Sequence, residues 1–228
     1  MQQIAIPGES PGRTHLAVVL DRSGSMESIR DDVIGGFNAF LAAQKAVEGE
    51  ATLTLVQFDS QDPFEVLADH VDLHAVSALS RGTFQPRGCT PLLDAVGKCI
   101  LATELWVSRQ SNALRPEHIV VVIVTDGQEN ASTEFKLERI RNLVAAKEML
   151  GWQFIFLSAD LAAFHEAGDI GIADRKRVYF SKDADGNREA FARTSEKVAM
   201  LRRREVADIA YDDVDREALA GGKTPPAP

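Results

Sequence analysis

The stretch Leu-Asp-Arg-Ser-Gly-Ser-Met at residues 20–26 is the part of this chain that decides its fold. It ends the apolar run 16–20, which has the composition of a short strand buried on both faces of a parallel sheet. A carboxylate and two hydroxyls then alternate at Asp21, Ser23 and Ser25, so that a turn can direct all three side chains into one pocket. We expect Gly24 to allow a tight or left-handed backbone in that turn. Carboxylate and hydroxyl oxygens suit a hard cation such as Mg²⁺ better than they suit zinc or copper.

Two later segments carry related side chains. A second β-branched apolar run, 119–124, also ends on a carboxylate, Asp126. Between the two runs, a loop passes into a helix at Thr90 and Pro91, which we expect to be the N-cap and the first helical residue. Parallel sheets bind ligands beyond the carboxyl ends of their strands, where the strand order reverses. If the strands that precede Asp21 and Asp126 are neighbours at that point, the two carboxylates converge.

Together these segments resemble the von Willebrand factor type A (VWA) domain and its metal-ion-dependent adhesion site. The family pattern is Asp-x-Ser-x-Ser, then a distant Thr, then a distant Asp, and it is matched in order by Asp21, Ser23, Ser25, Thr90 and Asp126. The resemblance covers roughly residues 14 to 180, which is the usual size of one domain. It implies a bound Mg²⁺, with Mn²⁺ and Ca²⁺ as alternatives of the same donor chemistry. It also implies a vacant coordination position that takes an Asp or Glu side chain from a protein partner.

The rest of the chain alternates strands with helices, which predicts an α/β fold. We expect a doubly wound, mostly parallel sheet with helices on both faces, that is, a Rossmann-like VWA fold. One strand, 64–71, carries charge and follows a short turn, so we expect it to be an antiparallel edge strand. The other expected strands are 53–58, 119–124, 152–157 and 178–180, and the expected helices are 27–47, 91–105, 134–150 and 161–167. Within the first helix, Gly35 and Gly36 are expected to allow a close approach to the sheet.

The chain is expected to divide into four parts. Residues 1–13 form a flexible N-terminal segment, and residues 14–181 form the VWA domain. Residues 182–210 form a linker, up to about residue 187, and a helix from 189 to 206 that packs on the domain or on a partner. Residues 211–228 are expected to be a disordered tail.

Composition excludes several classes of protein. A net charge of −9 over 228 residues argues against a nucleic-acid binder that works through a general positive field. The chain has no apolar run long enough to cross a membrane and no signal-peptide pattern at its start. Its two cysteines, Cys89 and Cys99, are separated by helix, too far apart for a disulfide. We therefore expect a cytoplasmic protein.

The remaining polar residues are not expected to be primary ligands. Asp59, Glu129 and Asn130 lie on loops at the same predicted sheet edge, where they can modulate the site. The five histidines are scattered and form no nucleophile arrangement, and His70 and His74 are expected at the surface.

Three functions are compatible with this pattern. The first is a non-catalytic, metal-dependent protein-binding module. The second is an Mg²⁺-dependent phosphoryl-transfer enzyme, against which we count Ser23, standing where a second Asp is needed, and the lack of an evident lysine at the end of a buried strand. The third is a structural domain stabilised by its metal. Compact intracellular VWA proteins of bacteria look similar, and the partners this resemblance suggests are ATPases, kinases and phosphatases.

Overall fold

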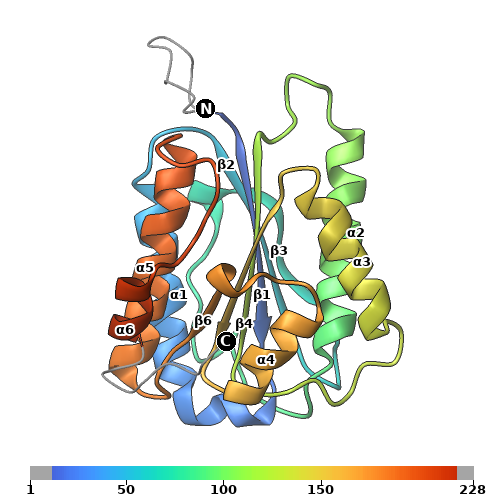
Figure 1. Ribbon diagram of the computed structural model, residues 1–228, viewed down its shortest axis with the longest axis vertical. Coiled ribbons are helices and arrows are strands. Elements are labelled where there is room, and N and C mark those ends of the chain that lie inside the picture. The colour runs from blue at the N-terminus through green and yellow to red at the C-terminus, as the bar shows by residue number, and fades with distance from the viewer. Residues whose placement is uncertain (1–11, 220–228) are drawn as a thin grey trace.

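A computed structural model describes residues 12–219 and shows one six-stranded sheet between two layers of helices (Figure 1). The strand order is β3-β2-β1-β4-β5-β6, and every neighbouring pair is parallel except β2 and β3. The antiparallel edge strand predicted from the sequence is therefore confirmed, as is the doubly wound architecture. The strands are β1 (Thr14–Asp21), β2 (Ala51–Phe58), β3 (Glu65–Asp72), β4 (His118–Thr125), β5 (Gln153–Ser158) and β6 (Arg177–Tyr179).

Six α-helices cover the two faces of the sheet. They are α1 (Arg30–Lys45), α2 (Leu92–Arg109), α3 (Leu137–Glu148), α4 (Leu161–Asp169), α5 (Ala184–Arg202) and α6 (Asp213–Leu219). Helices α1, α5 and α6 share one apolar core with the sheet, and α2, α3 and α4 share the other. Figure 1 shows these two groups on opposite sides of the strands. Three short 3-10 helices, Gly24–Ile29, Leu73–Ala75 and Asp174–Lys176, connect other elements.

The central strands are buried on both faces. In β1, Leu16 and Val18 belong to the core under α1, whereas Ala17 and Val19 belong to the core under α2. All eight residues of β1 are buried. This is why the sequence of β1 is a continuous apolar run, as is usual for a strand in the middle of a parallel sheet.

The strand order reverses between β1 and β4. From β1 the chain passes over one face to β2, and from β4 it passes over the other face to β5. The connections that leave β1 and β4 therefore diverge at the carboxyl ends of these strands and leave room for a ligand there. The fold places Asp21, the last residue of β1, and Asp126, directly after β4, at this point.

Helix α5 belongs to the same compact unit and begins earlier than expected. The predicted linker up to residue 187 is wrong, because the Asp183 carboxylate accepts a hydrogen bond from the Gly186 amide at 2.8 Å and so caps a helix that starts at Ala184. The helix packs on α1, where a Cβ atom on Gly36 would lie 2.4 Å from the Phe191 ring. The close approach at Gly36 is therefore to α5 and not, as expected, to the sheet.

Part of the predicted tail is ordered. Residues 213–219 form α6, and the side chains of Tyr211 and Leu219 are buried. The Tyr211 hydroxyl lies 2.7 Å from the Thr194 hydroxyl on α5. The expectation of disorder from residue 211 onward is wrong for 211–219, because two apolar residues in a polar segment are enough to dock it on the core. The remaining tail, 220–228, and most of the predicted N-terminal segment, 1–11, lie outside the described residues.

No helix between residues 12 and 219 is long and apolar enough to cross a membrane.

The amino-terminal edge of the sheet carries a cluster of aromatic rings. The rings of His15, His70 and Trp106 lie with their centroids 4.4–4.9 Å apart. His15 is fully buried, and burial, with a smaller contribution from His70, lowers its pKa to about 3. His70 is not the surface residue expected, because an irregular register between β2 and β3 turns its ring onto this stack; His74 is exposed.

The burial of His15 predicts that the free energy of unfolding falls as the pH is lowered. The folded state disfavours a proton on His15, so the unfolded state binds more protons below pH 6.5, and stability is lost as the pH falls from there toward about 3. Between pH 7 and pH 5 the loss due to His15 is about 2 kcal/mol. Urea unfolding of wild type and His15→Gln at these two pH values checks it. An equal loss in both proteins would contradict the assignment.

Candidate metal centre

Asp21 lies at the centre of the site and is completely buried. One carboxylate oxygen accepts the Ser23 amide hydrogen at 2.6 Å, and the other accepts the Thr125 hydroxyl at 2.6 Å. Burial raises the pKa of Asp21 to about 6, although the hydrogen bonds from Thr125 and Ser23 act against that shift. Because Thr125 is the last residue of β4, the pairing of β1 with β4 is what brings this donor to Asp21.

Asp126 supplies the second buried carboxylate. Its Oδ1 atom accepts the Ser25 hydroxyl at 2.5 Å, and the Ser25 and Ser23 hydroxyls lie 3.0 Å apart. Ser23 is buried, whereas Ser25 is exposed at the opening of the site. Four of the five residues predicted from the sequence are thus joined by hydrogen bonds, although they come from segments about a hundred residues apart.

Thr90, the fifth predicted residue, lies against the same group. A Cβ atom on Gly127 would lie 3.3 Å from the Ser25 hydroxyl and 3.5 Å from the Thr90 hydroxyl, so both hydroxyls surround one point beside Asp126. Only glycine at position 127 leaves that space open.

Thr90 does not cap the helix that follows, contrary to our expectation. Helix α2 begins at Leu92, with Pro91 in the cap position. The Thr90 amide instead donates to the Asn130 side chain at 2.9 Å, and the Asn130 amide donates to the Thr90 carbonyl at 3.1 Å. This pair of hydrogen bonds fixes Thr90 to the loop after β4.

The loop after β4 is itself fixed to the start of α2. Glu129 accepts the Leu93 amide hydrogen at 2.8 Å, and Ser132 accepts that of Asp94 at 3.0 Å. The Asp94 carboxylate accepts hydrogen bonds from the backbone amides of residues 133–135; these bonds hold its pKa below the ordinary value although burial acts in the other direction. The same bonds explain why α3 begins at Leu137 and not at residue 134 as expected.

A buried ion cluster connects the loop of Asp21 with the loop of Thr90. The Asp59 carboxylate accepts hydrogen bonds from the Nε atoms of Arg22 at 2.8 Å and Arg87 at 2.9 Å. The Arg87 amide donates to the Arg22 carbonyl at 2.8 Å. Asp59 is therefore bound to these arginines and does not join the oxygen cluster; its expected modulation of the site stays a prediction.

Gly88, and not Gly24, supplies the left-handed backbone of this region. Its φ angle is 67°, and a Cβ atom there would lie 2.6 Å from the Ser60 hydroxyl. The Gly24 amide donates to the Gly88 carbonyl at 3.1 Å, which closes the contact between the two loops. Of the two conformations expected for Gly24, the left-handed one is not observed, whereas the tight one is, because Gly24 begins the 3-10 helix Gly24–Ile29.

Lys182 is the residue of the site that sequence analysis missed. Its ammonium nitrogen lies 2.6 Å from Oδ2 of Asp126, a side chain with no exposed surface. Lys182 follows β6, which is two strands away from β4 in the sheet, and it lies far from Asp126 along the chain. Nothing in the sequence therefore indicated that these two side chains meet. We expected no evident lysine at the end of a buried strand, and Lys182 does not occupy such a position, because it follows β6, an edge strand that is only partly buried.

The donor set is suited to a hard cation. Two carboxylates and three hydroxyls meet here, with neither a thiol nor an imidazole. Across residues 12–219 no three His, Cys, Asp or Glu side chains form a cluster that could hold a metal. Any ion at this point would therefore depend on the hydroxyls of Ser23, Ser25 and Thr90 as well as on the carboxylates.

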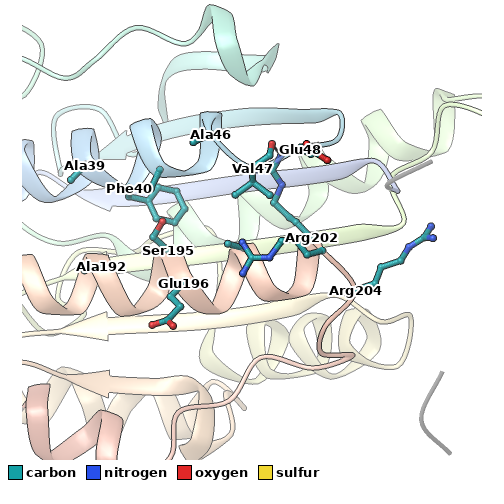
Figure 2. A pocket seen from close by; sticks show the side chains of 13 residues that line it. Ala39, Phe40, Ala46, Val47, Glu48, Ala192, Ser195, Glu196, Arg202 and Arg204 are labelled. Carbon is teal, nitrogen blue, oxygen red and sulfur yellow. Dashed lines mark hydrogen bonds between the residues drawn. The ribbon is translucent and has the colours of Figure 1, made fainter. Parts of the chain in front are cut away.

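A separate groove lies away from this site and contains none of its carboxylates or hydroxyls. It has a volume of about 860 Å³, lies between α1 and α5 and is bordered by alanines and other small or apolar residues, by two glutamates and, at one end, by arginines. Figure 2 shows Phe40 of α1 facing Ser195 of α5, and Arg202 reaching the end of α1. Arg202 donates to the Gln44 carbonyl of α1 at 2.5 Å and to the Val47 carbonyl, just beyond α1, at 3.3 Å, so it joins the two helices.

Comparison with known proteins identifies the fold. No protein-family profile and no curated protein sequence matches this chain. Solved structures do match. Proximal thread matrix protein 1 from the mussel byssus, in a form with a zinc-occupied MIDAS motif, is 16% identical with a TM-score of 0.55, covering 84% of this chain and 46% of the mussel chain. A von Willebrand factor type A protein from Catenulispora acidiphila is 14% identical with a TM-score of 0.53, covering 82% of this chain and 43% of its own.

A third structure, the manganese-loaded TRAP protein of Plasmodium vivax, is 15% identical with a TM-score of 0.56, covering 81% of this chain and 72% of that one. This chain therefore has the fold of a VWA domain, and it spans less than half the length of the mussel and Catenulispora chains. Two of the three similar structures hold a divalent metal.

The ion cluster predicts which substitutions destabilise the site loops. Asp59→Ala removes the fully buried partner of Arg22 and leaves it only the partly exposed Glu65, so we expect the free energy of unfolding to fall by about 3 kcal/mol. Arg87→Met removes a partner whose side chain is 42% exposed, so the expected loss is at most about 1 kcal/mol. Urea unfolding of both variants measures the difference. Equal losses would show that the cluster does not depend on Asp59.

Proposed function

We propose that this protein is a non-catalytic, divalent-metal-dependent protein-binding module. Asp21, Ser23, Ser25, Thr90 and Asp126 hold the ion, and Mg²⁺ is the proposed metal. The partner presents an Asp or Glu side chain to the vacant coordination position. ATPases, kinases and phosphatases are the partner classes suggested by the resemblance, and the cytoplasm is the proposed location.

The observation that carries this proposal is the meeting of two buried carboxylates and three hydroxyls at the switch point of the sheet. Two formal negative charges balance a divalent ion, and neutral hydroxyls complete its surroundings without adding charge. Where the two carboxylates act through waters, the direct protein ligands are the neutral hydroxyls, and the ion keeps an affinity for a further carboxylate. Magnesium also favours such oxygen sites and retains exchangeable waters. Similar structures that contain zinc or manganese support a divalent ion at this site.

The phosphoryl-transfer alternative loses one of the two arguments against it. Lys182 supplies the cation that seemed to be absent. The other argument holds, because Ser23 stands two residues after Asp21, where such an enzyme needs a second carboxylate, and its hydroxyl is engaged with Ser25. We therefore retain the binding module. Turnover of a phosphate ester such as p-nitrophenyl phosphate in Mg²⁺, lost in Asp21→Asn, would overturn this choice.

Metal binding itself predicts a gain in stability. A ligand at about 100-fold its Kd stabilises the folded state by about 2.7 kcal/mol. We expect that gain with Mg²⁺ in the wild type and its loss in Asp21→Asn, which removes a buried ligand charge. Asp62→Asn is the matched control, because Asp62 lies at the same edge of the sheet but its carboxylate accepts the Phe64 amide hydrogen. Calorimetric titration and thermal unfolding measure both effects.

Partner binding distinguishes a recognition module from a domain that uses metal only for stability. Proteins captured from a lysate in Mg²⁺ should be released by chelator and should not bind Asp21→Ala. Within a captured partner, replacement of one exposed Asp or Glu by its amide should abolish binding. If the metal stabilises the protein but capture persists in chelator, the ion is structural and does not form the contact.

A further inference from the structure

A lysine side chain contacts one of the two carboxylates of the proposed metal site. Asp126 has no exposed side-chain surface, and one of its oxygens is satisfied by the Ser25 hydroxyl. The other oxygen lies 2.6 Å from the ammonium nitrogen of Lys182. A carboxylate buried to this degree is costly unless a cation or several hydrogen bonds accompany it. In this structure Lys182 is that cation.

We propose that Lys182 sets the metal affinity of the site by competing with the ion for Asp126. This inference rests on the proposed metal-binding function. A divalent cation next to Asp126 would face the ammonium group at a few ångströms, where two like charges repel strongly because the site is buried. The metal therefore enters at the expense of the Lys182–Asp126 contact.

The position of Lys182 allows that exchange without disturbing the fold. Its side chain is 41% exposed, so the ammonium group can turn into water and regain its hydration there. The backbone on either side is fixed independently. Asp183 caps α5 through the Gly186 amide, and the Ser181 hydroxyl lies 3.1 Å from the Asp183 carboxylate. A rotation of the Lys182 side chain is sufficient, and α5 stays in place.

The exchange also explains why the metal-free site does not have to collapse. Without a cation, Asp21 and Asp126 would lie buried near each other as two negative charges. Lys182 neutralises one of them until the metal arrives. The same residue therefore stabilises the metal-free state and weakens the metal-bound state, whereas a purely structural lysine would support both states alike.

The test measures metal affinity and metal-free stability in the same variants. For Lys182→Met we expect Mg²⁺ and Mn²⁺ to bind about tenfold more tightly by calorimetric titration, and we expect the Tm in chelator to fall. Lys182→Arg keeps the charge and should bind metal like the wild type. Lys98→Met is the matched control, because Lys98 also forms a lysine–carboxylate contact of 2.6 Å, with Glu134, outside the site. It should leave the metal Kd unchanged.

The outcomes separate this inference from the function on which it rests. If wild type and Lys182→Met bind metal with equal Kd, the competition is disproved while the metal site stands. Equal tightening in Lys182→Met and Lys98→Met would reduce the effect to overall charge and also disprove it. If neither wild type nor Lys182→Met binds metal, the proposed function itself fails.

Discussion

Two carboxylates, Asp21 and Asp126, are buried side by side because β1 and β4 are parallel neighbours. Asp21 is the last residue of β1 and Asp126 directly follows β4 at the same edge of the sheet, so the fold itself brings the two charges together. Burial alone raises the pKa of Asp21, and the charge of Asp126 adds to that shift. The surrounding structure must offset this cost, and the arrangement of the neighbouring loops follows from that requirement.

The loops offset the cost with donors. The hydroxyls of Thr125 and Ser25 point at the carboxylates, and the ammonium group of Lys182 neutralises Asp126. Around them, Asp59 joins the loop after β1 to the loop that carries Thr90. Asn130 joins the Thr90 loop to the loop after β4. A site held in this way from three sides is already shaped before any ion binds. A metal therefore meets preorganised oxygens and does not have to order the loops itself.

The sequence was most informative where one local pattern determines the structure. The apolar run of β1 and the carboxylate after it predicted both the buried strand and the place of Asp21, and the charged alternation of 64–71 predicted the antiparallel edge. The five site residues were selected as a set through the resemblance to the VWA pattern, supported by the strand ends that precede Asp21 and Asp126. The structure brings these side chains together, while their role as metal ligands stays a prediction.

What the sequence did not predict depends on contacts between distant segments. Asp94 has the position of an ordinary first-turn acid, but its carboxylate binds backbone amides about forty residues later. Lys182 follows β6, a strand that is not adjacent to β4, and the segment that contains α6 is docked by Tyr211 and Leu219, which are buried in the core. In each case the local sequence is compatible with a simpler interpretation, and only the tertiary arrangement selects the observed one.

The most direct test of the account is anomalous diffraction from a crystal of the protein grown with Mn²⁺. The account predicts one strong manganese peak at the carboxyl end of β1 and β4, about 2 Å from hydroxyl or carboxylate oxygens of Ser23, Ser25 and Thr90 or the two aspartates. It also predicts that the Lys182 ammonium group no longer contacts the Asp126 carboxylate in that crystal. A saturating Mn²⁺ crystal without a peak there, and with Asp21 and Asp126 arranged as they are without metal, would contradict it.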